Sequence, residues 1–351
     1  MVIFEQIQFH NVEELEPSTT FSGHILQRYP KEVRHRLGRS GDQRGRFIAA
    51  MSTGCEIRFV TEAPVIRITL SAPITGGDIV VYNGDYVNSV HQLEAGVPKT
   101  LHLEVPADFA GVRPEALRQD GRFSPDVWRI FVSRSYLGGP GFQVAFHELD
   151  TFGHGHRPPL TNEIPARRWL AYGSSITQGS GATLHHQAYI QQAARRLGLD
   201  VLNKGLGGAC LCEPEAADFL AAHNGWEIAT LELGVNMRGH FTVEEFTGRA
   251  RYLVEQIAVK HPGKPIFLLN MFPNSSDFLR DASHPLTVAN REFREALRSI
   301  SQQLDLPNLH LLEGETILTD FSALAGDLIH PSDYGHILMG QRLAEEMQSR
   351  L

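Results

Sequence analysis

The chain has 351 residues, a length that favours two domains over one. Apolar residues make up 42% and charged residues 21% of the sequence, as is ordinary for a globular protein with a sizeable core. The net charge of −8 argues against a nucleic acid as the main partner, because that partner needs a basic surface.

Residues 1–150 are predicted to be rich in β-strands. Apolar and polar residues alternate at 66–70, 101–105 and 142–146. A period of two is typical of strands with one buried face. Short strands separated by glycine-rich turns, with no comparable helical stretch, indicate an all-β sandwich. We therefore expect a jelly-roll-like accessory domain over residues 1–150.

Two glycine-rich segments interrupt the pattern. Residues 34–46 are basic, and they could contact an anionic ligand, although a solvated loop is the commoner role for such a segment. Residues 151–167 are rich in Pro, Gly and His and are predicted to be a linker. His154 and His156 within it make a weak metal site, because no carboxylate or cysteine stands beside them.

From residue 168 to 351 the pattern changes to short apolar runs that alternate with amphipathic helices. Apolar runs of this kind, each followed by a helix, predict a parallel, doubly wound, flavodoxin-like sheet of five strands. Ligands of such sheets bind at the carboxyl ends of the strands. The five runs lie at 169–172, 201–203, 228–233, 266–269 and 309–312.

Residues with useful chemistry stand just past these predicted strand ends. Ser175 follows the first strand, Gly208 the second, Asn236 the third, and Asp327 with His330 the fifth. A serine hydroxyl needs a base to become a nucleophile, and histidine is suited to that task near neutral pH. A carboxylate three residues away can hold the imidazole in the required tautomer. The backbone N–H groups of Ser175 and Gly208 and the side-chain amide of Asn236 could stabilise an oxyanion.

These motifs resemble the conserved blocks of the GDSL-type SGNH hydrolases. The resemblance covers the C-terminal half of the chain and implies that Ser175 is the nucleophile, His330 the base and Asp327 the orienting acid. It also implies an oxyanion hole formed by Ser175, Gly208 and Asn236. The matching stretches are Gly173-Ser-Ser-Ile-Thr-Gln-Gly179, Asn203 with Gly208, Gly234-Val-Asn236 and Asp327-x-x-His330.

The sequence departs from the family pattern at two positions. Ser174 replaces the usual Asp before the nucleophile, and Met237 replaces the usual Asp after the third-block Asn. We expect Ser174, Met237 and the neighbouring Arg238 to help position a substrate. A β-sandwich ahead of such a domain is similar to the arrangement in some carbohydrate esterases and in a GDSL-like acyltransferase.

Other reactive side chains near the motifs have ordinary interpretations. Cys210 and Cys212 are expected to pack near the pocket, since a Cys-x-Cys pair lacks further metal ligands. Asp333 or His336 could serve as a second base, but both positions suit the first turn of the last helix. We expect no metal and no organic cofactor, because Ser–His chemistry requires neither.

The sequence thus predicts a serine esterase that removes a short acyl group, most simply acetyl, from a carbohydrate or similar polyol. One alternative is an acyltransferase that passes the acyl group to an alcohol acceptor. Another is a glycan-binding protein with a degenerate enzyme domain. The expected partner is a small-molecule acyl ester, for which an acetylated sugar is a candidate, with neither nucleic acid nor membrane involved. The sequence does not decide whether the protein forms a homo-oligomer.

The expected location is the cytoplasm. The N-terminal residues lack the basic region and long apolar core of a signal peptide. No apolar run approaches the length of a membrane span. Three cysteines are too few for a disulfide framework.

Overall fold

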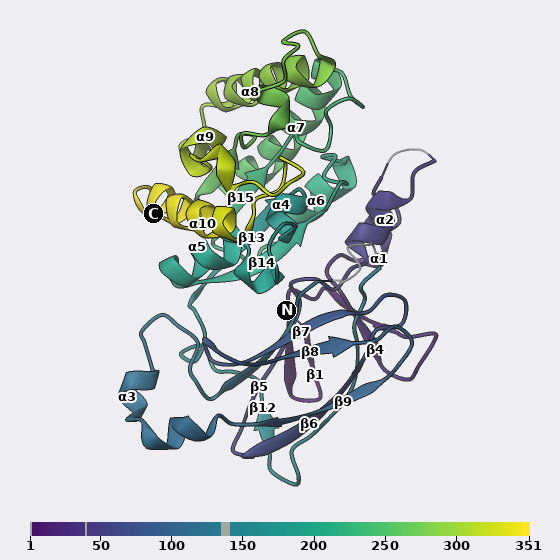
Figure 1. Cartoon of the computed structure of the whole chain (residues 1–351), viewed down its shortest axis with the longest axis vertical. Helices are drawn as coiled ribbons and strands as arrows, with labels where there is room; N and C mark the ends of the chain where they lie inside the picture. Colours follow the sequence, from purple (N-terminus) through teal and green to yellow (C-terminus); the bar gives the residue numbers. More distant parts are fainter. Residues whose placement is uncertain (1, 39–40, 135–140) are drawn as a thin grey trace. The chain divides into compact units, whose positions relative to one another are not determined.

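The structure, a computed structural model, describes residues 2–38, 41–134 and 141–351. The chain divides into two compact units, which Figure 1 shows as a β-rich part and a part with mixed helices and strands. The first unit comprises Met1–Arg34, Phe47–Ala166 and Gly198–Asp200. The second comprises His35–Arg46, Arg167–Leu197 and Val201–Leu351.

The first unit contains two sheets, in agreement with the predicted sandwich. One has the order β1-β2-β5-β10-β7-β8, and the other β3-β4-β11-β6-β9. The pairs within both sheets are antiparallel. The strands of the first sheet are β1 (Val2–Phe4), β2 (Ile7–His10), β5 (Glu56–Thr61), β10 (Val127–Val132), β7 (Gly77–Asn83) and β8 (Tyr86–Leu93). Those of the second are β3 (Glu14–Pro17), β4 (His24–Gln27), β11 (Ala145–Asp150), β6 (Val65–Ser71) and β9 (Lys99–Glu104).

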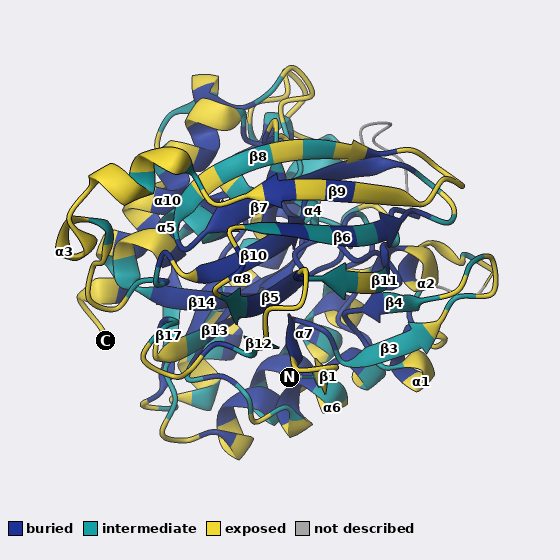
Figure 2. Ribbon diagram, turned by 90° about the horizontal axis from the view of Figure 1, so that it is seen from below, coloured by how far each residue is buried: buried dark blue, intermediate teal, exposed yellow. Residues whose placement is uncertain are grey.

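Burial along the strands follows their position in the sheets. The residues of β10, a central strand, are all buried, whereas β9 lies at an edge and alternates between exposed and buried residues near its end (Figure 2). Strands β6 and β9 match the predicted runs. The third run is shifted, because β11 begins only at Ala145, and Phe142 and Val144 are buried ahead of it. Helices in this part are short: α1 (Lys31–Arg34), α2 (Arg44–Ala49), η1 (Ala107–Gly111) and α3 (Pro114–Leu117).

Of the segment 151–167, predicted to be a linker, residues 151–166 are part of the first unit and Arg167 opens the second. They contain strand β12 (His156–Arg157), which pairs antiparallel with β5. Both guanidinium Nη atoms of Arg157 donate hydrogen bonds of 2.7 Å to the carboxylate of Glu163. A two-residue strand shows no periodicity, so its pairing cannot be recognised in a Pro- and Gly-rich sequence.

The second unit is built on a five-stranded parallel sheet with helices, as predicted. Its order, β14-β13-β15-β16-β17, is the 2-1-3-4-5 order of flavodoxin-like folds. Strands β13, β15, β16 and β17 pair in parallel. The strands are β13 (Arg167–Gly173), β14 (Leu199–Gly205), β15 (Ile228–Glu232), β16 (Ile266–Leu269) and β17 (Leu309–Leu312).

Two groups of helices accompany this sheet. Helices α5 and α10 pack side by side, while α7 contacts both α6 and α8 (Figure 1). Thr242 and Glu245 form a capping box at the start of α7. The helices are α4 (Ser175–Gln178), α5 (Tyr189–Leu197), α6 (Pro214–Ala222), α7 (Val243–Lys260), α8 (Pro285–Leu304), α9 (Gly314–Ile317) and α10 (Asp333–Gln348). Single 3₁₀ turns occur at η2 (His185–Gln187), η3 (Ser275–Asp277) and η4 (Phe321–Ala323).

The buried face of α10 includes a histidine. Leu343, Met347 and His336 are buried, whereas Ile337 is 48% exposed. In the described part of the chain, no helix is both long enough and apolar enough to cross a membrane.

Candidate active site

The site is built where the strand order of the parallel sheet reverses. Strand β13 lies between β14 and β15, so the loops that follow β13 and β15 leave the sheet at its topological switch point. Ser175 opens α4 directly after β13. Gly173 is required at this turn, because a Cβ atom there would lie 2.4 Å from the hydroxyl oxygen of Thr177. The chain can therefore turn sharply and present Ser175 at the sheet edge.

Ser175, His330 and Asp327 form a hydrogen-bonded row. The Oγ atom of Ser175 lies 2.8 Å from Nε2 of His330. The Nδ1 atom of the same imidazole lies 2.6 Å from Oδ2 of Asp327. Since Nδ1–H donates a hydrogen bond to the carboxylate, Nε2 is the nitrogen that can accept the serine proton. The row is accessible to solvent, because the side chains of His330 and Asp327 are 26% and 49% exposed.

Asp327 is held in its ionised form. Burial acts to raise the pKa of this carboxyl group, but hydrogen bonds from the His330 imidazole and from two backbone N–H groups outweigh it, so that the pKa is lowered. The two backbone donors belong to Ile329 and His330, and each lies 3.0 Å from Oδ1. The carboxylate is thus fixed in place and can stabilise an imidazolium.

The three groups predicted to form an oxyanion hole have no acceptor in the described protein. Among residues that the structure describes, no acceptor lies within hydrogen-bonding distance of the N–H groups of Ser175 and Gly208 or of Nδ2 of Asn236. The Oδ1 atom of Asn236 accepts the backbone N–H of Cys210 at 3.2 Å, which fixes the amide orientation and leaves Nδ2 as the free donor. Gly208 has φ +70°, a conformation that favours glycine. These donors have the chemistry of an oxyanion hole.

Comparison with known proteins agrees with this geometry. Residues 166–348 match the family described as GDSL-like lipase/acylhydrolase. The chain belongs to this family. It is therefore an SGNH serine hydrolase, as the sequence motifs predict. No curated protein is significantly similar to it.

Several solved structures share the fold of this GDSL-family enzyme. The salicylyl-acyltransferase SsfX3 from a tetracycline biosynthetic pathway has a TM-score of 0.76 and 18% identity, with 98% of this chain and 95% of that chain covered. A family two carbohydrate esterase from Clostridium thermocellum has a TM-score of 0.60 and 15% identity, covering 85% and 93%. A family two carbohydrate esterase from Cellvibrio japonicus has a TM-score of 0.60 and 14% identity, covering 99% and 95%.

Glu232, which the sequence analysis did not single out, supports the turn that carries Ser175. Its Oε2 atom accepts hydrogen bonds from the backbone N–H of Ser174 at 2.7 Å, from the Ser174 hydroxyl at 2.6 Å and from the Thr177 hydroxyl at 3.1 Å. Burial raises the pKa of this carboxyl group against the effect of those bonds. The sequence feature that could have pointed to Glu232 is its place inside the apolar run 228–233, because a buried carboxyl group needs hydrogen-bond partners.

The three residues predicted to position a substrate pack or form hydrogen bonds within the protein. Ser174 and Met237 are buried, and the Ser174 hydroxyl also accepts the N–H of Ile176 to cap α4. Nη1 of Arg238 donates to Oδ1 of Asn274 at 2.8 Å and to Oδ1 of Asn290 at 2.6 Å. Ser174 and Met237 are thus closed off from solvent, whereas Arg238 is half-buried, and a role of the three residues in positioning a substrate stays a prediction.

The interpretation of Asp333 and His336 as helix-start residues agrees with their contacts. Oδ1 of Asp333 accepts the backbone N–H of Thr183 at 2.6 Å. Nδ1 of His336 accepts the backbone N–H of Tyr189 at 3.1 Å, and its Nε2 donates to the carbonyl of Ser180 at 3.1 Å. Both imidazole nitrogens of His336 are therefore occupied, and the side chain is not available as a second base.

His336 should make the folded protein sensitive to acid. Burial lowers the pKa of His336 from its ordinary value of 6.5 to about 4. Below pH 6.5 the imidazole is protonated in the unfolded chain but stays neutral in the folded protein. The free energy of unfolding should therefore decrease as pH falls from 6.5 to 4, by about 3 kcal/mol at most. Urea unfolding of wild type and of His336→Gln, whose amide can make similar bonds, measures this. Parallel pH curves for the two proteins would contradict the assignment.

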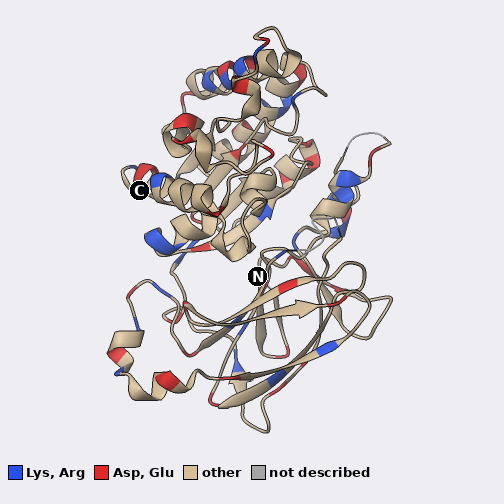
Figure 3. Ribbon diagram, in the orientation of Figure 1, with Lys and Arg blue, Asp and Glu red and all other residues tan. Residues whose placement is uncertain are grey.

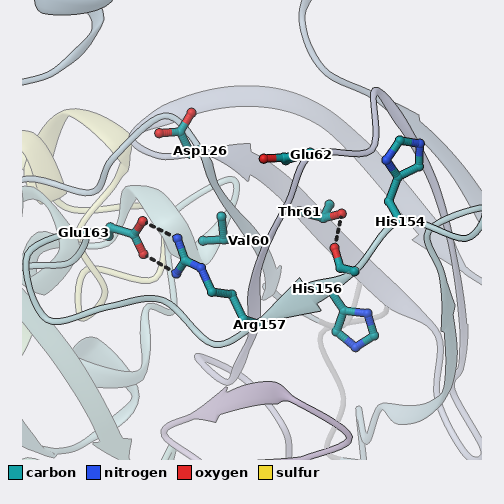
Figure 4. A pocket seen from close by; sticks show the side chains of 9 residues that line it. Val60, Thr61, Glu62, Asp126, His154, His156, Arg157 and Glu163 are labelled. Carbon is teal, nitrogen blue, oxygen red and sulfur yellow. Dashed lines mark hydrogen bonds and ion pairs between the residues drawn. The ribbon is translucent and has the colours of Figure 1, made fainter.

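The cysteines near the site and the histidines of residues 151–167 lie in separate surroundings. Cys210 and Cys212 are buried free thiols, in line with a packing role, and burial raises the pKa of Cys210. Within the described ranges, no three His, Cys, Asp or Glu side chains gather as metal ligands. Figure 4 shows His154 and His156 at a pocket of the first unit with their rings extending in different directions. Nε2 of His156 contacts the carbonyl of Glu5 at 2.9 Å.

Proposed function

We propose that the protein is an esterase in which Ser175 attacks a short acyl ester and forms an acyl-enzyme. The observation that carries this proposal is the 2.8 Å contact between Ser175 Oγ and His330 Nε2, with Asp327 bound to the far side of the same ring. Nucleophile, base and orienting acid are thus in the order that acyl transfer by serine requires.

The proposed reaction proceeds in two halves. His330 accepts the Ser175 proton as Oγ bonds to the ester carbonyl carbon, and the resulting imidazolium then gives that proton to the departing alcohol. In the second half, His330 takes a proton from water as the water oxygen attacks the acyl carbonyl carbon. The bond from that carbon to Ser175 Oγ then breaks, the imidazolium gives its proton to Oγ, and the acid is released. Asp327 stays ionised and stabilises the imidazolium in both halves.

The oxyanion formed in each half lies against three proposed donors. These are the N–H groups of Ser175 and Gly208 and the side-chain amide of Asn236. Because none of them is bonded to the described protein atoms, they need not break a bond before they bind the oxyanion. Donors that are already oriented provide stabilisation without reorganisation during the reaction.

We further propose a small acyl group, with acetyl as the first to test, on a carbohydrate or similar polyol. Two observations support this. The shared fold includes family two carbohydrate esterases, one of them solved in complex with cellohexaose. In addition, the partly exposed His330 and Asp327 leave the alcohol side of the ester open to solvent, which suits a bulky polar alcohol.

A fluorophosphonate probe tests the proposed nucleophile directly. The probe should label the folded protein once, at Ser175, because the paired imidazole activates that hydroxyl and the donors stabilise the phosphonyl oxygen. Peptide mass spectrometry locates the label, and p-nitrophenyl acetate turnover should be lost in proportion to labelling. Unfolded protein serves as the control. Labelling at another serine with loss of activity would refute the assignment.

An acyltransferase is the second candidate, supported by the fold shared with the salicylyl-acyltransferase. The same acyl-enzyme would then be attacked by an alcohol in place of water. The acyl-enzyme then divides between transfer to the alcohol and hydrolysis by water. The ratio of transferred to hydrolysed product, measured with a candidate alcohol acceptor present, gives this division. A ratio that rises above the non-enzymatic value and saturates with acceptor would favour the transferase.

A further inference from the structure

The basic segment of the N-terminal half is part of the second unit. Residues 35–46 belong to it, although the chain on either side lies in the first unit, and residues 39 and 40 are outside the described part. The backbone N–H of Gly38 donates a 2.8 Å hydrogen bond to Oε1 of Glu213. Helix α2 begins within the segment, at Arg44, and bears basic residues, as Figure 3 shows. The sequence left open whether this segment is a solvated loop or meets an anion.

The segment forms one side of a small pocket that borders the proposed oxyanion hole. The pocket has a volume of about 170 Å³, enough for a short chain of non-hydrogen atoms. The other side contains two of the proposed oxyanion donors, Gly208 and Asn236. The lining residues are Gly38, Asp42, Arg44, Gly45, Gly208, Ala209, Leu211, Asn236 and His240, all in the second unit.

Arg44 places a cation against the oxyanion glycine. A Cβ atom built on Gly208 would lie 2.5 Å from both Nε and Nη2 of Arg44, so the guanidinium rests on the Gly208 main chain. The side chain is exposed, and among the described residues nothing accepts a hydrogen bond from its guanidinium. A guanidinium remains charged at any ordinary pH and matches a carboxylate with two parallel donors.

The geometry indicates which part of an ester would reach Arg44. The departing alcohol must lie next to His330, because that imidazole supplies its proton. Neither Ser175, Asp327 nor His330 lines the pocket, whereas Gly208 and Asn236 do. A group that extends past the oxyanion donors and away from His330 is the acyl group.

We propose that Arg44 is a specificity-determining residue that favours acyl groups ending in a carboxylate over neutral acyl groups of the same length. This inference rests on the proposed function and narrows its substrate class to esters of short dicarboxylic acids. Asp42 opposes the effect from the same pocket. Its Oδ1 accepts the backbone N–H of Arg44 at 2.9 Å, so its charge lies close to an incoming carboxylate.

The test compares ethyl hydrogen succinate with ethyl butyrate, two four-carbon acyl groups that differ in the terminal carboxylate. Ethanol release gives kcat/KM for each ester. The succinate-to-butyrate ratio should fall about tenfold in Arg44→Gln and be partly retained in Arg44→Lys, as expected for one exposed charge-assisted contact. Added salt should lower the wild-type ratio, since it screens an exposed charge.

Two further variants separate this effect from overall charge. Arg46→Gln removes the same charge two residues along, where Nη2 contacts Nε2 of His35 at 3.3 Å outside the pocket, and should leave the ratio unchanged. Asp42→Asn keeps the acceptor for the Arg44 N–H and should raise the ratio. An unchanged ratio in Arg44→Gln, with both esters still hydrolysed, overturns the role of Arg44 and leaves the esterase intact. No hydrolysis of either ester, nor of p-nitrophenyl acetate, by wild type overturns the proposed function itself.

Discussion

Replacing Ser175 by alanine should reduce turnover of p-nitrophenyl acetate by about 10⁴-fold or more and leave thermal unfolding unchanged. The variant loses the only oxygen placed to attack the carbonyl, and water held near His330 is a poor substitute. Stability should persist because the Ser175 hydroxyl is partly exposed and its hydrogen bond in the structure is to His330. Stopped assays at high enzyme concentration and a thermal melt measure the two quantities.

The combination with His330 makes this test sharper. If Ser175 and His330 act as one unit, Ser175→Ala, His330→Ala and the double variant should have nearly equal residual rates. Either single change already abolishes attack by the serine, so the second change has no further effect on the rate. His310→Ala is the matched control, since that half-buried histidine lies on β17 beside Phe267 and away from the row. Fully multiplicative losses, or a Ser175→Ala enzyme with more than a tenth of wild-type activity, would contradict the mechanism.

The parallel sheet could be predicted from the sequence because buried strands appear as continuous apolar runs. The runs 266–269 and 309–312 coincide with β16 and β17, and the run 228–233 differs from β15 by one residue. Once these strands were placed, the rule that their carboxyl ends share an edge brought Ser175, Asn236 and His330 together. The 2.8 Å contact between Ser175 and His330 agrees with this expectation.

Other features depend on contacts between distant parts of the sequence. Nothing local indicates that Arg44 lies on Gly208, or that Glu232 accepts hydrogen bonds from the turn after β13. The family pattern suggested a substrate role for the two positions where acidic residues were replaced. At the first of these positions, Ser174, the carboxyl group of Glu232 on the neighbouring strand accepts a hydrogen bond from the serine hydroxyl. Side-chain direction at a turn is likewise set by packing, as buried Met237 illustrates.

Substitutions of Asn236 should also have a large effect on turnover. At this position the effect on kcat can be separated from the effect on the stability of the fold. Asn236→Ala removes a proposed oxyanion donor and should lower kcat by about 10²- to 10³-fold with little change in KM, because the donor acts mainly on the charged transition state. It also leaves the backbone N–H of Cys210 without its acceptor, so this variant should be less stable by about 1–3 kcal/mol.

Asn236→Asp distinguishes the two losses. One carboxylate oxygen can still accept the Cys210 N–H, so stability should exceed that of the alanine variant. The other oxygen would face the oxyanion and repel it, so kcat should be no higher than in Asn236→Ala. Steady-state kinetics and urea unfolding on the three proteins measure both quantities. If the aspartate variant regained activity together with stability, Asn236 would act only by holding the loop at Cys210, and the oxyanion would be stabilised by the backbone donors alone.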